Sequence, residues 1–334
     1  MSGWMLIDVA LFAILLCSGI AIAKIRQLFA VAMLSGIFSL TSACIFVMQD
    51  AVDVAFTEAA VGAGMTTVLL LGALALTRTR EKLTPTARSV PALLVALTTG
   101  ALLVHASGDL PAFGIEDSPV QTHPVTERYL VSSVEEIGVP NVVTSVLASY
   151  RGYDTFGEVV VIFTAAVAVL MLLGQRAPRE VRERAAPMRD RQRVLRVIAK
   201  LLIPFILLFG LYVQFHGDYG PGGGFQAGVI FAAGVVLYAL VFGLDAARAA
   251  VPMRALRPLL AAGVLLYGGV GVATLLLGGA FLDYDLLAAE DPVAGQHLGI
   301  LLVELGVGIT VTSAMIMLFY GFAGRGIGRG VGRS

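Results

Sequence analysis

The chain has 334 residues, of which 57% are hydrophobic and only 14% are charged. Its 23 basic and 23 acidic residues cancel, so the overall charge does not favour nucleic-acid binding. Apolar segments this long and frequent exclude a soluble globular protein and predict an all-α, polytopic membrane protein. The only cysteines, Cys17 and Cys44, lie in apolar segments without metal-ligand spacing, so we expect neither a metal site nor a disulfide.

Hydrophobic segments of about 20 residues predict nine membrane spans. They run approximately over residues 4–23, 28–48, 54–76, 90–105, 155–174, 197–215, 224–244, 256–281 and 295–322. The fourth of these segments is the shortest. The first is apolar from Trp4 and has no basic region before it, so it is expected to be a span and not a signal peptide.

The distribution of basic residues predicts the orientation of these spans. With the amino terminus outside and the carboxyl terminus inside, 21 of the 23 basic residues fall in inner loops or at inner helix ends. Only Arg128 and Arg151 remain outside. Because basic residues are retained on the cytoplasmic side, the pattern predicts an N-out/C-in topology, which requires an odd number of spans.

The order of spans and loops predicts four parts. Residues 1–88 form a three-helix module, and residues 89–175 form a two-helix module with an outer loop. The outer loop is expected to end in a surface helix over residues 126–150, with Pro140 starting its second half. Residues 176–196 carry eight arginines against three acids and are expected to be a basic cytoplasmic linker, and residues 197–334 form a four-helix module.

One glutamate lies inside the third span, in the stretch DVAFTEAAVGAG. Holding the ionised carboxylate of Glu58 there costs ~2.5–3.5 kcal/mol, so such residues usually face protein or water and mark ion paths. Ala55, Ala59 and Ala63 repeat at a spacing that lets another helix approach closely. We therefore predict an ion- or proton-translocating role for Glu58; the alternative is a helix-end carboxylate with a structural partner.

Further ionisable residues lie at membrane depth. Glu158 is just inside the fifth span, where Arg151 and Asp154 share its face at helical spacing and make a structural salt bridge the competing interpretation. Glu304 lies midway along the last span with His297 two turns earlier on nearly the same face, which predicts a proton or cation path. The alternative is a protonated carboxyl group that is hydrogen-bonded to a neighbour. Lys200 is one turn into the sixth span and is included among the candidates, although a lysine there can also extend to the inner surface.

A glycine-rich turn, FHGDYGPGGGFQAG over residues 215–228, precedes the seventh span. Irregular backbone at this depth is tolerated where it is buried or lines water, so the turn is a candidate cavity edge. The resemblance of this stretch to a dinucleotide fingerprint is rejected because apolar helices, and not a strand, flank it. The residues selected here for a cavity or close helix packing are Asp218, Pro221, Gly222, Gly223, Gly224, Gln226 and Gly228.

Three stretches resemble known membrane modules. DVAFTEAAVGAG is similar to the signature of the small membrane subunit shared by Mrp-type cation/proton antiporters and membrane-bound hydrogenases, which is related to a membrane component of complex I. NVVTSVLASYRGYDTFGE, residues 141–158, resembles the neighbouring segment of those systems. IPFILLFGLYVQFHGDYGPGGGFQAG, residues 203–228, closely resembles the signature of the B subunit of Mrp antiporters. These stretches occur in the family's order.

The resemblance implies a multi-pass subunit of a multisubunit Na+/H+ antiporter in the inner cell membrane. It implies large antiporter-like subunits as partners, Na+ or another monovalent cation and protons as transported ions, no enzyme activity and no cofactor. The glutamates implicated in transport in that family correspond to Glu58 and Glu158, whereas Glu304 falls outside the matched motifs. The alternative is the ion-pumping membrane part of a hydrogenase or ferredoxin-oxidising complex, with its redox centres in other subunits.

The predicted topology can be tested with reporter tags. A tag at Arg184 or at the carboxyl terminus should report a cytoplasmic location, and a tag at Asp117 an external one, because the arginine-rich segments are retained inside. Protease accessibility of the tags in intact cells and in inverted vesicles measures this. An external Arg184 would contradict the span count.

Overall fold

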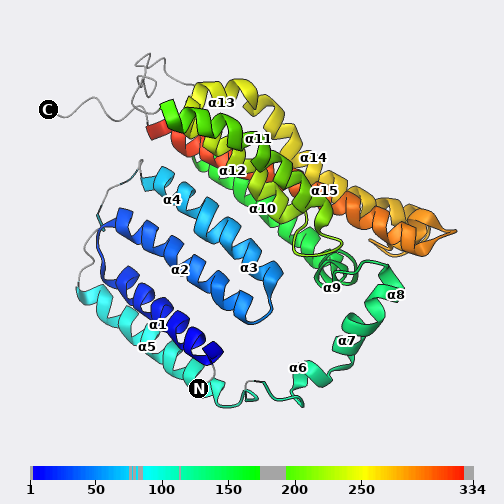
Figure 1. Ribbon diagram of the computed structural model, residues 1–334, viewed down its shortest axis with the longest axis horizontal. Helices are drawn as coiled ribbons and strands as arrows, with labels where there is room; N and C mark the ends of the chain where they lie inside the picture. Colours follow the sequence, from blue (N-terminus) through cyan, green and yellow to red (C-terminus); the bar gives the residue numbers. More distant parts are fainter. Residues whose placement is uncertain are drawn as a thin grey trace.

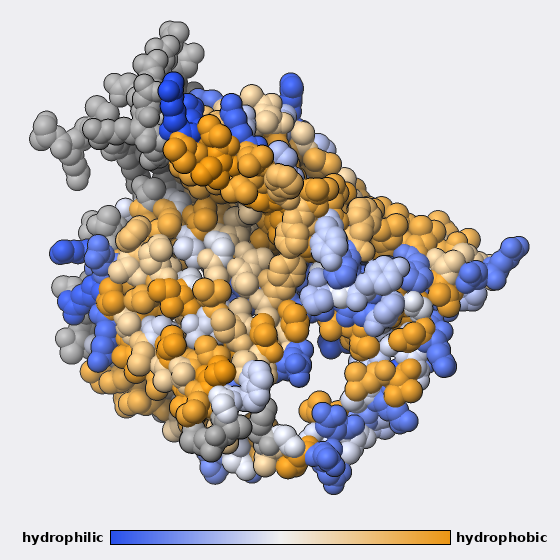
Figure 2. Space-filling model, in the orientation of Figure 1, coloured by the Kyte–Doolittle hydropathy of each residue, from blue (hydrophilic) through white to orange (hydrophobic). Residues whose placement is uncertain are grey.

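The computed structural model describes residues 3–74, 77, 80–81, 86–112, 114–173 and 193–326, which form helices joined by turns (Figure 1). Within these residues, nine helical spans are long and apolar enough to cross a membrane, as predicted. Hydrophobic side chains cover most of the visible helix surface, and hydrophilic ones gather at its ends (Figure 2). The chain is therefore an all-α, multi-pass membrane protein, and its N-out/C-in orientation stays a prediction.

The first four spans are contributed by helices before residue 108. They are α1 (Gly3–Lys24), α2 (Leu28–Met48), a composite third span and α5 (Thr86–Ser107). The third span consists of α3 (Val52–Glu58), the π-helix η1 (Ala59–Thr66) and α4 (Thr67–Leu74). The sequence predicted a regular helix here, whereas the structure widens the helix at the small residues that follow Glu58. A π-helical stretch is uncommon and is frequently found at functional sites.

The segment after α5 forms an arc of short helices that leads into the carboxyl-terminal bundle (Figure 1). These helices are α6 (Pro119–Thr122), α7 (Pro124–Glu127), η2 (Arg128–Ser132), α8 (Ser133–Ile137), α9 (Val142–Thr144) and η3 (Ser145–Tyr150).

The prediction of one surface helix over residues 126–150 was wrong. The chain bends by 90° between residues 124–137 and 142–150. Gly138, at φ +80°, ends the first part, and Pro140 precedes the second, which begins at Val142. Thr144 and Ala148 are buried, because the second part packs into the bundle.

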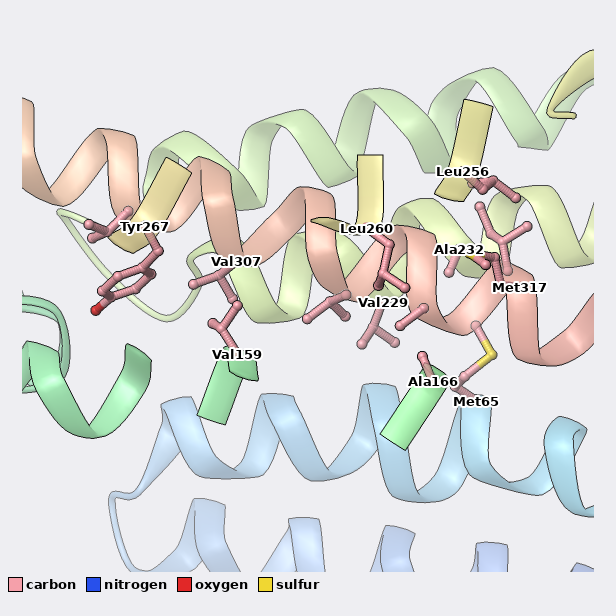
Figure 3. Packing of buried hydrophobic residues seen from close by; sticks show 14 of the residues in the cluster. Met65, Val159, Ala166, Val229, Ala232, Leu256, Leu260, Tyr267, Val307 and Met317 are labelled. Carbon is pink, nitrogen blue, oxygen red and sulfur yellow. The ribbon is translucent and has the colours of Figure 1, made fainter. Parts of the chain in front are cut away.

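The remaining helices form the main core. They are α10 (Gly152–Leu173), α11 (Arg193–His216), α12 (Gly224–Phe242), α13 (Leu244–Ala250), α14 (Met253–Leu276), η4 (Tyr284–Ala288) and α15 (Pro292–Gly326). Helix α15 is central, and 61% of its apolar membrane-spanning stretch is buried. Helices α10, α12 and α14 pack around it. The third span joins this core because η1 packs on α12 and α4 on α15. Figure 3 shows Met65, Ala166 and Met317 in the shared hydrophobic cluster.

Two predicted boundaries differ from the structure. The eighth span ends at Leu276 and not at Phe281, because Gly278 adopts φ +93° and the Thr274 hydroxyl oxygen accepts the Leu282 N–H at 3.0 Å. Helix α11 begins at Arg193, inside the predicted basic linker. The rest of that linker and the end of the glycine- and arginine-rich tail lie outside the described residues.

Close packing of α12 on α15 depends on the predicted pair Gly224 and Gly228. A Cβ added to Gly228 would lie 2.9 Å from the Gly308 carbonyl oxygen and 2.8 Å from Cβ of Val311. A Cβ at Gly224 would overlap the Glu304 carbonyl oxygen. The glycine step therefore brings the two helix backbones together, as its spacing predicted.

We expect Gly228→Val to destabilise the bundle by about 1–3 kcal/mol, because the added carbons overpack the α12–α15 contact. Gly269→Val is the matched control, since a Cβ on Gly269 of α14 meets nothing within 4 Å. Thermal unfolding of the purified protein measures both. Equal losses in the two variants would contradict this account of the packing.

Candidate functional site

The glycine-rich turn between α11 and α12 lies directly on the carboxylate of Glu304. The Gly223 N–H donates to the Val213 carbonyl at 3.0 Å, which closes the turn on itself. A Cβ on Gly223 would lie 2.8 Å from Oε1 of Glu304, and one on Gly217 would lie 3.2 Å from Oε2. Gly223 also has φ +116° and ψ −175°, a conformation that is essentially restricted to glycine. The motif is thus a backbone cover over a carboxylate.

Side chains from two other parts of the chain hold this turn. Asp53 Oδ1 at the start of α3 accepts the Gly222 N–H at 3.0 Å. The amide nitrogen of Asn141 donates to the carbonyls of Gly217 and Gly220 at 3.0 and 2.9 Å. Gln226, which the sequence selected for this region, donates its amide to Thr57 Oγ1 at 2.9 Å. The turn is therefore a junction of all three helical modules.

A cavity of about 280 Å³ lies at this junction. Its wall combines three carboxylates with apolar side chains, among which Figure 3 shows Tyr267, Val159 and Val307. The lining residues are Asp53, Val54, Thr57, Val143, Thr144, Leu147, Ala148, Thr155, Glu158, Val159, Ile162, Gly222, Gly223, Gly224, Phe225, Gln226, Tyr267, Val303, Glu304 and Val307. The wall is mostly apolar, and its three carboxylates are the charged groups that face this space.

The structure brings two of the three predicted glutamates to this cavity. Glu158 of α10 and Glu304 of α15 line it together with Asp53. Glu304 is half-buried, whereas Glu158 is exposed on this chain. Arg151 pairs with Asp154 at 2.5 Å, so the salt-bridge interpretation holds for that pair, and within the described residues Glu158 forms no ion pair.

Glu58 does not line the cavity. The added Cβ of Gly62 would lie 2.5 Å from Oε1 of Glu58 and 2.5 Å from Oγ of Ser39, which places the carboxylate between η1 and α2. Five residues separate Glu58 from Asp53, a rotation of about 140° on an α-helix. The two acids therefore point to different sides of the third span, and Asp53 is the one that reaches the cavity.

His297 and Lys200 also lie apart from the Glu304 carboxylate. His297 Nδ1 is 3.4 Å from Oδ2 of Asp218, which lies in the glycine-rich turn, so the predicted histidine contacts the turn instead. Lys200 Nζ lies 6.0 Å from the centre of the Phe242 ring, and Lys200 is not among the residues that line the cavity. The geometry gives Lys200 no contact with the acids.

Sequence reasoning missed several residues of the site. Asp53 and Asn141 lie within the quoted stretches, but only their contacts show that they hold the turn. Tyr267 donates to the Gly152 carbonyl at 2.7 Å, and Tyr284 donates to the Ala148 carbonyl at 2.9 Å. Burial raises the pKa of Tyr284, so its hydroxyl stays a neutral donor that fixes η3 beside the cavity.

Carboxylates facing a hydrated cavity at membrane depth can take up and release protons or monovalent cations. Within the described residues, no group of three His, Cys, Asp or Glu side chains is close enough to hold a metal ion.

Comparison with known proteins finds three family models that match successive parts of the chain. A family model described as a domain related to the MnhB subunit of the Na+/H+ antiporter matches residues 194–317. The MbhD and MbhE models, which describe two further subunits of MBH, match residues 13–79 and 87–191. Among curated relatives, "Putative antiporter subunit mnhB2" of Staphylococcus aureus is 31% identical over 41% of this chain and 98% of the relative. A probable K(+)/H(+) antiporter A/B subunit of Rhizobium meliloti is 26% identical over 93% of this chain.

Two solved structures share the fold. A chain of the Mrp complex from Dietzia sp. DQ12-45-1b matches 94% of this chain with 25% identity and a TM-score of 0.75. A chain of the membrane-bound sulfane sulfur reductase, an archaeal respiratory membrane complex, matches 71% of this chain with 29% identity and a TM-score of 0.54. This chain spans 34% of the length of both the Rhizobium relative and the Dietzia chain, and 98% of the reductase chain.

The fold and the site define a multi-pass membrane subunit of the kind found in ion-translocating complexes. With a relative of 31% identity covered almost completely, the chain belongs to the MnhB family of Na+/H+ antiporter subunits. The resemblance to the B subunit of Mrp antiporters and to the small hydrogenase-type modules is thereby confirmed.

The contact between the glycine-rich turn and Glu304 can be tested with a matched pair of variants. Gly223→Ala should displace the Glu304 carboxylate and abolish any transport that depends on it, since the new Cβ would lie 2.8 Å from Oε1. Gly243→Ala imposes a similar backbone strain, at φ +100° and ψ 153°, but its Cβ meets nothing within 4 Å. Ion exchange in membrane vesicles measures both. Equal activity in the two variants would contradict the role of the contact.

Proposed function

We propose that this chain is a membrane subunit of a multisubunit monovalent cation/proton antiporter, and that it contributes intramembrane carboxylates to ion or proton transfer. The single observation that carries the proposal is that Glu158, Glu304 and Asp53, from different modules, line one cavity. A carboxylate kept at membrane depth is expensive, and such residues usually mark ion pathways. The relatives named for Na+/H+ and K+/H+ antiport support this choice of activity.

The proposal includes the organisation and the surroundings of the chain. Residues 1–88, 89–175 and 197–334 are the three membrane modules, joined by the basic linker 176–196. The complex resides in the inner cell membrane, includes large antiporter-like subunits and exchanges Na+ or another monovalent cation for protons. The subunit moves ions without catalysing a chemical reaction and needs no cofactor. Its match to a chain of the Mrp complex supports partner subunits of this kind.

Within this proposal, Glu304 and Glu158 exchange protons or cations with the water of the cavity. Glu58 serves the opposite side of the third span, beside Ser39 of α2. The π-helix that follows Glu58 widens the span between these two regions. His297 and Asp218, both partly exposed at the outer end, form the contact between solvent and the turn over Glu304.

A second candidate is the ion-pumping membrane part of a redox complex. The matches to MbhD, to MbhE and to the archaeal respiratory complex favour it. The two candidates differ in their driving force. An antiporter dissipates an imposed pH gradient when the cation alone is added, whereas a redox-driven complex needs an electron donor as well.

We expect Glu58→Gln, Glu158→Gln and Glu304→Gln each to abolish exchange in the assembled complex, because each keeps the side-chain shape and removes only its ionisation. Asp154→Asn is the control, since Asp154 is exposed and pairs with Arg151. Glu58→Asp should keep partial activity, because the carboxylate survives with ~1 Å less reach against a hydrogen bond of about 2.7 Å. Cation-induced dissipation of a pH gradient in inverted vesicles, without an electron donor, is the measurement.

Wild-type activity in the glutamine variants would contradict the transport role of the acids. Exchange that appears only when an electron donor is added would favour the redox complex. Co-purification of the partner subunits with each variant verifies that the complex still assembles.

A further inference from the structure

The carboxylate of Asp53 connects all three modules at the glycine-rich turn. Its Oδ1 accepts the Gly222 N–H at 3.0 Å, and its Oδ2 lies 3.4 Å from the amide nitrogen of Asn141. That same amide donates to two carbonyls of the turn, and its Oδ1 accepts the Val143 N–H at 3.0 Å. These contacts fix the orientation of the Asn141 amide, because its nitrogen must face the acceptors and its oxygen must face the Val143 N–H.

Asp53 lies in the first turn of α3, where an acid interacts favourably with the helix dipole. Its carboxylate makes no hydrogen bond to that turn among the described contacts and instead crosses to the module after residue 197. Asp53 therefore has a tertiary role in addition to its place at the helix end. A carboxylate accepts hydrogen bonds from two N–H donors more strongly than a neutral side chain would.

What the Asp53 contacts hold in place is the backbone that covers Glu304. Gly222, the partner of Asp53, is followed directly by Gly223, where an added Cβ would lie 2.8 Å from Oε1 of Glu304. On the other side, Thr144 Oγ1 donates to the Gly217 carbonyl at 2.6 Å, and Asn141 N–H donates to the Asp218 carbonyl at 3.0 Å. Both ends of the turn are thus attached to helices outside its own module.

We propose that Asp53 is a positioning residue that holds the glycine-rich turn closed over Glu304, so that the module junction controls water access to this carboxylate from the outer end. This inference rests on the proposed function, because control of water access to Glu304 has a use only if Glu304 lies on a transport path. It adds a residue that acts through the turn and does not itself need to carry the ion.

Cysteine accessibility tests the proposal directly. In a background with Cys17→Ser and Cys44→Ser, the Val303→Cys reporter places a thiol beside Glu304 in the cavity wall, where Val303 is 1% exposed. The Leu260→Cys reporter places one in the core outside the cavity, at 2% exposure. The whole complex in lipid nanodiscs is treated with a charged thiol reagent, and no ion gradient is applied.

With Asp53→Ala, we expect labelling of the Val303→Cys reporter to accelerate about tenfold or more, since a hydrogen bond to a charged group contributes that much to an equilibrium constant. Asn141→Ala should act in the same direction. Asp53→Asn should give an intermediate rate, because it keeps one acceptor for Gly222 but turns an amide donor toward Asn141. Asp154→Ala removes an exposed outer carboxylate that pairs only locally with Arg151 and should leave labelling unchanged.

The Leu260→Cys reporter separates a positioning role from general loosening. Under the proposal its labelling stays at the wild-type rate in every variant. Faster labelling of both reporters, or of neither, would overturn the proposal. If the wild-type complex showed no cation/proton exchange, the antiporter proposal would fall, while the labelling rates would still report whether Asp53 controls access to Glu304.

Discussion

The organising constraint of this structure is the placement of a carboxylate inside a membrane bundle. Glu304 is on the most buried helix, and an ionised group there is expensive unless protein dipoles or water surround it. The glycine-rich turn covers this carboxylate with backbone: a Cβ added to Gly223 would lie 2.8 Å from Oε1, and one added to Gly217 would lie 3.2 Å from Oε2. The other parts of the site follow from the need to hold that turn in place.

The backbone N–H and C=O groups of an irregular segment at membrane depth need hydrogen-bond partners. The carbonyls of Gly217 and Gly220 accept hydrogen bonds from the side chains of Asn141 and Thr144. The Gly222 N–H donates a hydrogen bond to the carboxylate of Asp53. Because these partners come from the two preceding modules, the hydrogen bonds of the turn need all three modules in contact.

The cavity beside the turn is lined by regions that match three different family models. Its wall takes Asp53 from the region matched by MbhD, Glu158 from the region matched by MbhE and Glu304 from the MnhB-related domain. Apolar residues such as Val159 and Val307 line the same wall (Figure 3).

The sequence by itself determined the membrane class, the nine spans, the close α12–α15 contact and the family, because hydrophobic length, small-residue spacing and the glycine motif are local signals. It identified Glu158 and Glu304, since any acid in an apolar span stands out. Only the tertiary structure decided that these two share a cavity, that Asp53 joins them and that Glu58 faces α2. The rotation of each helix and the tilt between helices set these relations, and both depend on packing between residues far apart in the chain. The bend at Gly138 and the π-helix after Glu58 escaped prediction for the same reason.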